Sequence, residues 1–153
     1  MLAGWRIVPS EFADTAFDGE GARLYGGRWN SKGVSMVYAS LHLSLAALEI
    51  RVHIEATSKR KNYSCIAFHF DKTIMRVLTA RDLPKNWQHE PSIPSAKRIG
   101  DSWVESKASV ILGVPSVVVP EELNLLINPK HPDFKKIQMD KPTSFVFDDR
   151  LFR

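Results

Sequence analysis

Three residue types that could bind a nucleotide lie close together in the segment from Gly19 to His53. Arg28 stands in the glycine-rich run GGRWN, Tyr38 ends a short apolar run, and Glu49 falls among apolar residues. A guanidinium binds phosphate oxygens in a bidentate manner, and an aromatic ring offers a flat apolar surface. The segment therefore predicts a pocket for an anionic, planar ligand, a description that a nucleotide would satisfy.

Glu49 is expected on the apolar face of a helix. Four aliphatic residues recur at spacings of four, three and four, which is typical of a helix face against a core: Leu41, Leu45, Leu48 and Val52. Glu49 follows Leu45 by four positions, so it shares that face. A carboxylate there is costly unless it is paired or hydrogen-bonded. It is either half of a structural ion pair, with Arg6 or Arg28, or a functional group that stabilises positive charge or orients a hydroxyl.

The other polar candidates also have two interpretations. Arg28 could tie its loop to a carboxylate or to main-chain carbonyls, and Tyr38 could be a core aromatic residue. Ser116 follows Pro115, where a turn serine is the default. Asn124 and Asn128, in LNLLINP, could be turn formers or ligand donors, and their spacing does not decide between these roles.

Composition narrows the function classes. The chain has 153 residues, a size typical of one domain, and its single cysteine excludes an internal disulfide. No apolar run is long enough for a membrane helix, and a cytoplasmic location is expected. The five histidines lack metal-ligand spacing, so no catalytic metal is expected. The net charge of +4 is spread along the chain, and its densest run, Lys59–Lys61, is expected to be a solvated loop rather than a nucleic-acid patch.

The pattern of short apolar runs predicts an α+β fold, with a mixed or antiparallel sheet as its core and flanking helices. Strands are expected at residues 5–8, 36–39, 63–70, 76–78, 110–112, 117–119, 123–127 and 144–147. Helices are expected after Ser10, after Ser40 and at residues 103–109, with the two serines as candidate caps. Residues 18–33 are expected to be an irregular loop, and residues 82–95 a loop or a short turn of helix.

Taken together, these residues resemble the RES domain family, which is named after a recurring arginine, glutamate and serine. The matching blocks run in family order along nearly the whole chain: WRIVP (5–9), AFDGEGARLYGGRWNSKG (16–33), VYAS (37–40), SLAALEIRVH (44–53), GDSW (100–103) and VPSVVVPEELNLLINPKHPD (114–133). The resemblance implies a single RES domain over residues 1–153 with a fold similar to ADP-ribosyltransferases.

The resemblance also implies an activity and partners. Family members are the toxin halves of bacterial toxin–antitoxin pairs, and their antitoxins carry an Xre-like helix-turn-helix. They deplete NAD by hydrolysis or phosphorolysis, so phosphate is a possible co-substrate, and some transfer ADP-ribose to a protein. By this likeness DNA is contacted only through the antitoxin, and a toxin homodimer within the complex is possible.

A non-catalytic nucleic-acid-binding module is the alternative function from another class, and this alternative predicts salt-sensitive binding to nucleic acid.

The resemblance assigns roles to individual residues. The family arginine, glutamate and serine correspond to Arg28, Glu49 and Ser116, and the pocket tyrosine corresponds to Tyr38. Glu49 would stabilise the charge on the ribose, with Arg28 on the pyrophosphate and Tyr38 against the nicotinamide or ribose. Further substrate contacts are expected from Arg6, Ser116 and Asn124.

Overall fold

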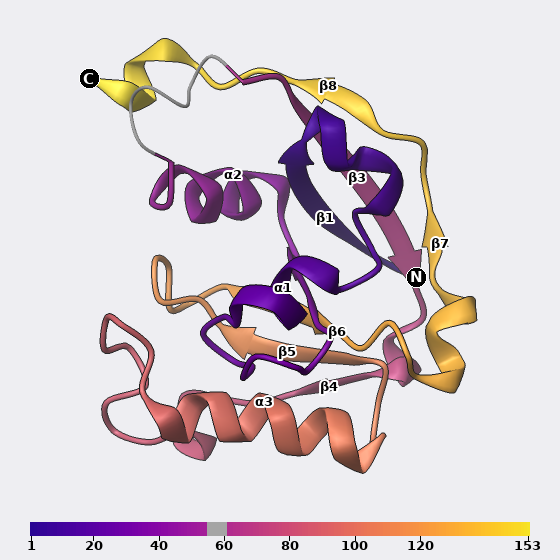
Figure 1. The fold of residues 1–153 in the computed structure, drawn as a ribbon, viewed down its shortest axis with the longest axis vertical. Helices are drawn as coiled ribbons and strands as arrows, with labels where there is room; N and C mark the ends of the chain where they lie inside the picture. Colours follow the sequence, from indigo (N-terminus) through magenta and orange to yellow (C-terminus); the bar gives the residue numbers. More distant parts are fainter. Residues whose placement is uncertain (55–60) are drawn as a thin grey trace.

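The computed structural model describes residues 1–54 and 61–153, which form one mixed sheet with helices packed against it (Figure 1). The strands are β1 (Leu2–Pro9), β2 (Val37–Ser40), β3 (Tyr63–Phe70), β4 (Met75–Val77), β5 (Ile111–Pro115), β6 (Leu123–Ile127), β7 (Gln138–Met139) and β8 (Thr143–Phe145). Their order is β4-β5-β6-β2-β1-β3-β7, and β8 also pairs with β3. The neighbours β4 and β5 run parallel, whereas the other pairs are antiparallel. The predicted α+β fold with a mixed sheet is confirmed.

Three α-helices accompany the sheet in the described part of the chain: α1 (Glu20–Tyr25), α2 (Leu43–Arg51) and α3 (Pro94–Ser106). Helix α2 lies against β1, and α3 runs along the β4–β5 end of the sheet (Figure 1). Short 3₁₀ segments connect these elements at Ser10–Thr15, Lys72–Ile74, Ala80–Asp82, Pro132–Lys136 and Asp149–Phe152. Within the described residues, no helix is both long and apolar enough to cross a membrane.

Side chains alternate between the two faces of the sheet along each strand, and in the central strands both faces are buried. On one face, Val37, Leu125 and Ile127 pack with Phe68 and Phe70. On the other face, Leu112, Val114 and Leu126 pack under α3 together with three tryptophans: Trp29, Trp87 and Trp103. This second face continues into the polar groups of the candidate site.

Helix α2 packs through a different stripe from the one expected. Leu45 is buried as predicted, but Leu48 is 36% and Val52 is 56% exposed. The residues against β1 are instead Leu43, Ala46, Ala47 and Ile50. The sequence carries two overlapping apolar stripes, and the second one packs against β1. Ser40 is not the cap, since the helix begins after His42 and has no side-chain cap.

Other boundaries also differ from the prediction. Residues 18–33 contain α1, and α3 begins at Pro94, a residue whose fixed φ suits the first turn of a helix. Residues 117–119 form a turn rather than a strand. Ser10 is not a cap either, because Pro9 occupies the cap position of that 3₁₀ segment. Lys59 and Arg60 of the expected basic loop lie outside the described residues.

Gly100 allows α3 to lie directly on the backbone at Trp29. A Cβ atom built on Gly100 would lie 1.7 Å from the Trp29 carbonyl oxygen. We therefore expect Gly100→Ala to lower the free energy of unfolding by about 1–3 kcal/mol, the usual cost of overpacking. Urea unfolding followed by circular dichroism measures this change.

Gly21→Ala is the matched control for this prediction. Gly21 also lies in a helix, but a Cβ atom there would meet no atom within 4 Å. Because alanine favours helices over glycine, this variant should be as stable as the parent or more stable. Equal stability of the two variants would contradict the packing assigned to Gly100.

Candidate functional site

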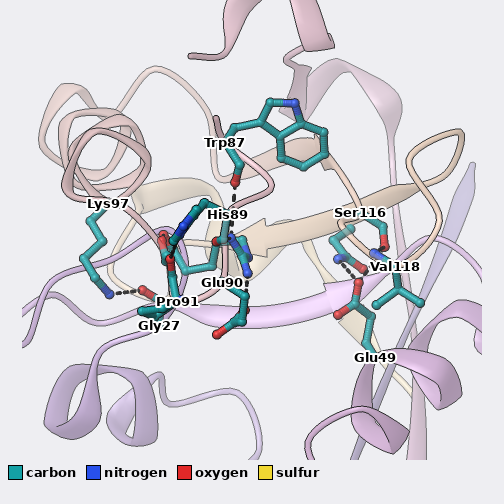
Figure 2. A network of polar contacts seen from close by, with 12 residues as sticks. Gly27, Glu49, Trp87, His89, Glu90, Pro91, Lys97, Ser116 and Val118 are labelled. Atoms are coloured by element: carbon teal, nitrogen blue, oxygen red, sulfur yellow. Dashed lines mark hydrogen bonds and ion pairs between the residues drawn. The ribbon is translucent and has the colours of Figure 1, made fainter. Parts of the chain in front are cut away.

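The carboxylate of Glu49 is held by two neutral hydrogen-bond donors. Its Oε1 accepts from Ser116 Oγ at 2.6 Å and from Asn124 Nδ2 at 2.7 Å. These three side chains come from α2, from the turn after β5 and from β6, so the fold brings distant parts of the chain to one oxygen. Figure 2 shows the Glu49 and Ser116 side chains directed toward each other.

Ser116 is oriented by the turn that follows it. Its side chain is buried, and its Oγ accepts hydrogen bonds from the backbone N–H groups of Val118 and Val119, each at 3.0 Å. Because backbone donors already occupy the acceptor side of the hydroxyl, its own proton is directed to Glu49. The expected turn serine is therefore also a partner of the carboxylate.

Asn124 is oriented by Ser40, a residue that the sequence did not single out for the site. The Ser40 hydroxyl is buried in β2 and donates to Asn124 Oδ1 at 2.7 Å. This bond identifies the oxygen end of the amide, and it leaves the NH₂ end to donate to Glu49. Ser40 and Asn124 are directly opposite each other on the neighbouring strands β2 and β6.

The second carboxylate oxygen of Glu49, Oε2, is unpaired within the described residues. Among the described residues no donor contacts Oε2. This oxygen is not buried either, so solvent reaches it. The described residues also contain no ion pair to Glu49, so of the two interpretations the structural pair with Arg6 or Arg28 is not formed. A carboxylate with one fixed oxygen and one accessible oxygen is suited to stabilising a cation or binding a hydroxyl.

Arg28 contacts a loop that lies between β4 and α3. Its Nη1 donates to the carbonyl oxygens of Trp87 at 3.2 Å and His89 at 2.9 Å. Its Nη2 forms an ion pair with the carboxylate of Glu90. Both alternatives considered from the sequence, main-chain carbonyls and a carboxylate, are therefore realised at this arginine. Figure 2 shows Trp87, His89 and Glu90 on the side of the view away from Ser116.

Tyr38 fixes the glycine-rich loop that carries Arg28. Its hydroxyl donates to Asn30 Oδ1 at 2.6 Å and accepts from the Trp29 N–H at 3.0 Å. Burial raises the pKa of Tyr38 above its ordinary value, so the hydroxyl stays protonated and can act as this donor. A Cβ atom at Gly27 would lie 2.5 Å from the Tyr38 hydroxyl oxygen, so this close approach requires glycine.

Strand β2 connects the two halves of the site. Tyr38 and Ser40 are two residues apart on this strand, so their side chains lie on the same face about 7 Å apart. Tyr38 positions the Arg28 loop, whereas Ser40 positions Asn124 and through it Glu49. Strand β2 therefore carries one residue that supports the Arg28 loop and one that supports Glu49, whereas the Arg28 guanidinium itself contacts Trp87, His89 and Glu90.

Arg6 and Asn128 make structural contacts. Arg6 donates from Nε to the Ala16 carbonyl at 2.6 Å and from Nη1 to the Tyr38 carbonyl at 2.7 Å. Burial lowers the pKa of Arg6 to about 10, against the opposing effect of nearby Asp18. Asn128 is buried, and its Oδ1 accepts from the Lys130 N–H at 3.0 Å, as a turn former does.

Metal-ligating side chains do not cluster in the part of the chain that the structure describes. The side chains that meet around Glu49 are instead the Ser116 hydroxyl and the Asn124 amide, with the Ser40 hydroxyl behind Asn124. The Arg28 guanidinium is bonded to the loop at Glu90 rather than to this cluster.

Comparisons with known proteins give one consistent family. The model of the RES domain matches residues 3–148. The chain is 38% identical to "Toxin Res" of Yersinia enterocolitica over 148 residues, which are 96% of this chain and 97% of that protein. It is also 38% identical to "Prs ADP-ribosylating toxin" of a Sphingobium strain over 154 aligned positions, covering 97% and 96% of the two chains.

A solved structure has the same fold at lower sequence identity. The toxin–antitoxin complex MbcT–MbcA of M. tuberculosis contains a chain that aligns with a TM-score of 0.79 and 15% identity, covering 99% of this chain and 86% of that one. The family model matches nearly the whole length of this chain, and two relatives are well above 30% identical to it. This chain therefore belongs to the RES domain family.

Proposed function

We propose that this protein is the toxin of a bacterial toxin–antitoxin pair and that it cleaves the bond between nicotinamide and ribose in NAD. The observation that carries the proposal is the Glu49 carboxylate, whose Oε1 is fixed by Ser116 and Asn124 while Oε2 remains accessible. Relatives that are named toxins over nearly the same length support the biological role.

Cleavage of this bond requires a negative charge near the ribose more than it requires an acid to protonate the leaving group. Nicotinamide in NAD is already cationic, and it leaves as a neutral molecule with the electron pair of the glycosidic bond. The ribose carbon that it leaves becomes positively charged in the transition state. Glu49 would stabilise that charge or bind the ribose hydroxyls through Oε2, because its neutral partners do not cancel its charge.

The remaining residues would position the substrate. Arg28 would bind the pyrophosphate, and Tyr38 would hold the loop that carries Arg28 and present its ring to the nicotinamide or ribose. Ser116 and Asn124 act on Glu49 in this structure, so their first role is to orient the carboxylate. Arg6 would support the site through the Tyr38 carbonyl.

The acceptor of the ADP-ribosyl group defines two versions of the reaction. Water or phosphate as acceptor gives NAD depletion, whereas a protein side chain as acceptor gives ADP-ribosylation. The relative named "Prs ADP-ribosylating toxin" favours keeping the second version. NAD labelled in its adenylate part distinguishes them: label in free ADP-ribose or its phosphate indicates depletion, and label on protein in a cell extract indicates transfer.

An antitoxin would silence the enzyme by covering the site. The solved complex with the same fold pairs a toxin with an antitoxin, which supports a protein partner for this chain. We propose that the antitoxin is Xre-like and that DNA is contacted through that partner. We also propose that the toxin forms a dimer within the complex. A cognate antitoxin that is co-expressed with this chain should relieve growth arrest and co-purify with it.

Ser40 is proposed as a positioning residue for this reaction. Ser40→Ala removes the bond that orients the Asn124 amide, at a cost of about 1 kcal/mol, so we expect kcat to fall about fivefold with KM nearly unchanged. Steady-state assays of nicotinamide release measure both constants. Ser44→Ala, an exposed serine on α2, is the control, and a Ser40→Ala rate equal to that control would contradict the role.

A further inference from the structure

We infer that Glu90 is a built-in competitor for the anion-binding position at Arg28, which the phosphate groups of the substrate must displace. The identification of that anion as the pyrophosphate of NAD rests on the proposed function. The occupancy of Arg28 by a side-chain carboxylate rests on the geometry alone.

The two ends of the Arg28 guanidinium have different partners. Nη1 donates to two main-chain carbonyls, at Trp87 and His89, and these bonds hold the group in place. Nη2 pairs with the Glu90 carboxylate, and within the described residues Nε has no acceptor. The edge formed by Nε and Nη2 is the one that a phosphate would bind in bidentate fashion, and Glu90 uses only half of it.

The loop that carries Glu90 is fixed at both sides of this residue. The buried Trp87 ring stacks on Trp29 with centroids 6.4 Å apart, and the Ser92 hydroxyl donates to the Arg28 carbonyl at 2.6 Å. The Glu90 side chain itself is 73% exposed, whereas that of Arg28 is only 18% exposed. The carboxylate can therefore swing into water while the loop backbone and the guanidinium stay in position.

Exchange of this carboxylate for a phosphate is physically favourable. Glu90 returns to solvent with little loss, because its side chain is already mostly exposed and an ion pair with a solvated partner is weak. A pyrophosphate brings more charge and can use the free Nε as well as Nη2. While Glu90 occupies Arg28, the site is closed to the ligand, and the apparent affinity falls by the fraction of time for which it is open.

Calorimetric titration with inorganic pyrophosphate tests the competition without involving NAD chemistry. Glu90→Gln should bind pyrophosphate about fivefold more tightly than the wild type, as expected when a mostly solvated carboxylate no longer occupies the guanidinium. Glu105→Gln removes the same charge from an exposed position on α3 that has no ion pair among the described residues, and it should change binding much less. Equal affinities for the two variants would overturn the inference.

Steady-state assays with NAD then test whether the substrate uses this position. Glu90→Gln should lower KM for NAD by about the same fivefold factor without changing kcat. An unchanged KM in an active enzyme would overturn the displacement by substrate. If the wild type releases no nicotinamide but Glu90→Gln still tightens pyrophosphate binding, the proposed function fails while the competition at Arg28 stands.

Discussion

Glu49→Gln is expected to lower the rate of nicotinamide release by about 10²–10³-fold, the usual loss when one preorganised electrostatic group is removed from a transition state. Ser116 and Asn124 both donate to the same oxygen, so the carbonyl oxygen of a glutamine can take its place. The amide NH₂ then occupies the accessible Oε2 position. The substitution removes the negative charge and leaves the hydrogen bonds that hold the side chain.

The measurement is chromatography of nicotinamide from reactions at saturating NAD, with urea unfolding to confirm that stability is retained. Glu105→Gln provides a control with the same loss of charge at an exposed position of α3. Glu49→Ala should also abolish growth arrest in cells. A Glu49→Gln enzyme with the rate of the Glu105→Gln control would contradict the role of the carboxylate.

Arg28→Lys is expected to lower kcat/KM for NAD by about 10- to 100-fold, mainly through KM. A lysine keeps the charge, but it cannot contact two phosphate oxygens from one planar edge, and the lost charge-assisted bonds correspond to a loss of this size. It also cannot donate to the carbonyls of Trp87 and His89 while binding an anion with the same geometry. Arg28→Ala should abolish growth arrest entirely.

Initial rates over a range of NAD concentrations separate the effects on KM and kcat. Arg98→Lys, at an exposed position on α3, is the matched control and should behave like the wild type. Arg28→Lys with an unchanged KM would show that the arginine only supports its loop. That outcome would also remove the substrate from the competition assigned to Glu90.

The fold class and the residues of the site could be predicted from the sequence to different extents. The strands at residues 63–70 and 123–127 were predictable because their apolar runs are long and bounded by polar residues. The proximity of Glu49, Ser116 and Asn124 depended on family resemblance, since 67 and 75 residues separate the two partners from Glu49. No local periodicity encodes contacts at such separations.

The contacts that could not be predicted from the sequence all depend on strand register or loop packing. The sequence around Ser40 is typical of a helix cap, and only the pairing of β2 with β6 places this residue opposite Asn124. Glu90 lies in a proline-rich loop without periodicity, so its pairing with Arg28 could not be predicted. The choice of stripe on α2 depended in turn on packing against β1, which no pattern within the helix itself specifies.

The most direct test of the central claim is to incubate the purified protein with NAD, with and without phosphate, and to follow nicotinamide by chromatography. We expect that the wild type releases nicotinamide, that Glu49→Gln releases almost none, and that the product formed with phosphate identifies the acceptor. Release at the same rate by Glu49→Gln, or no release by a folded wild type even with a cell extract as a source of protein acceptors, would contradict this claim.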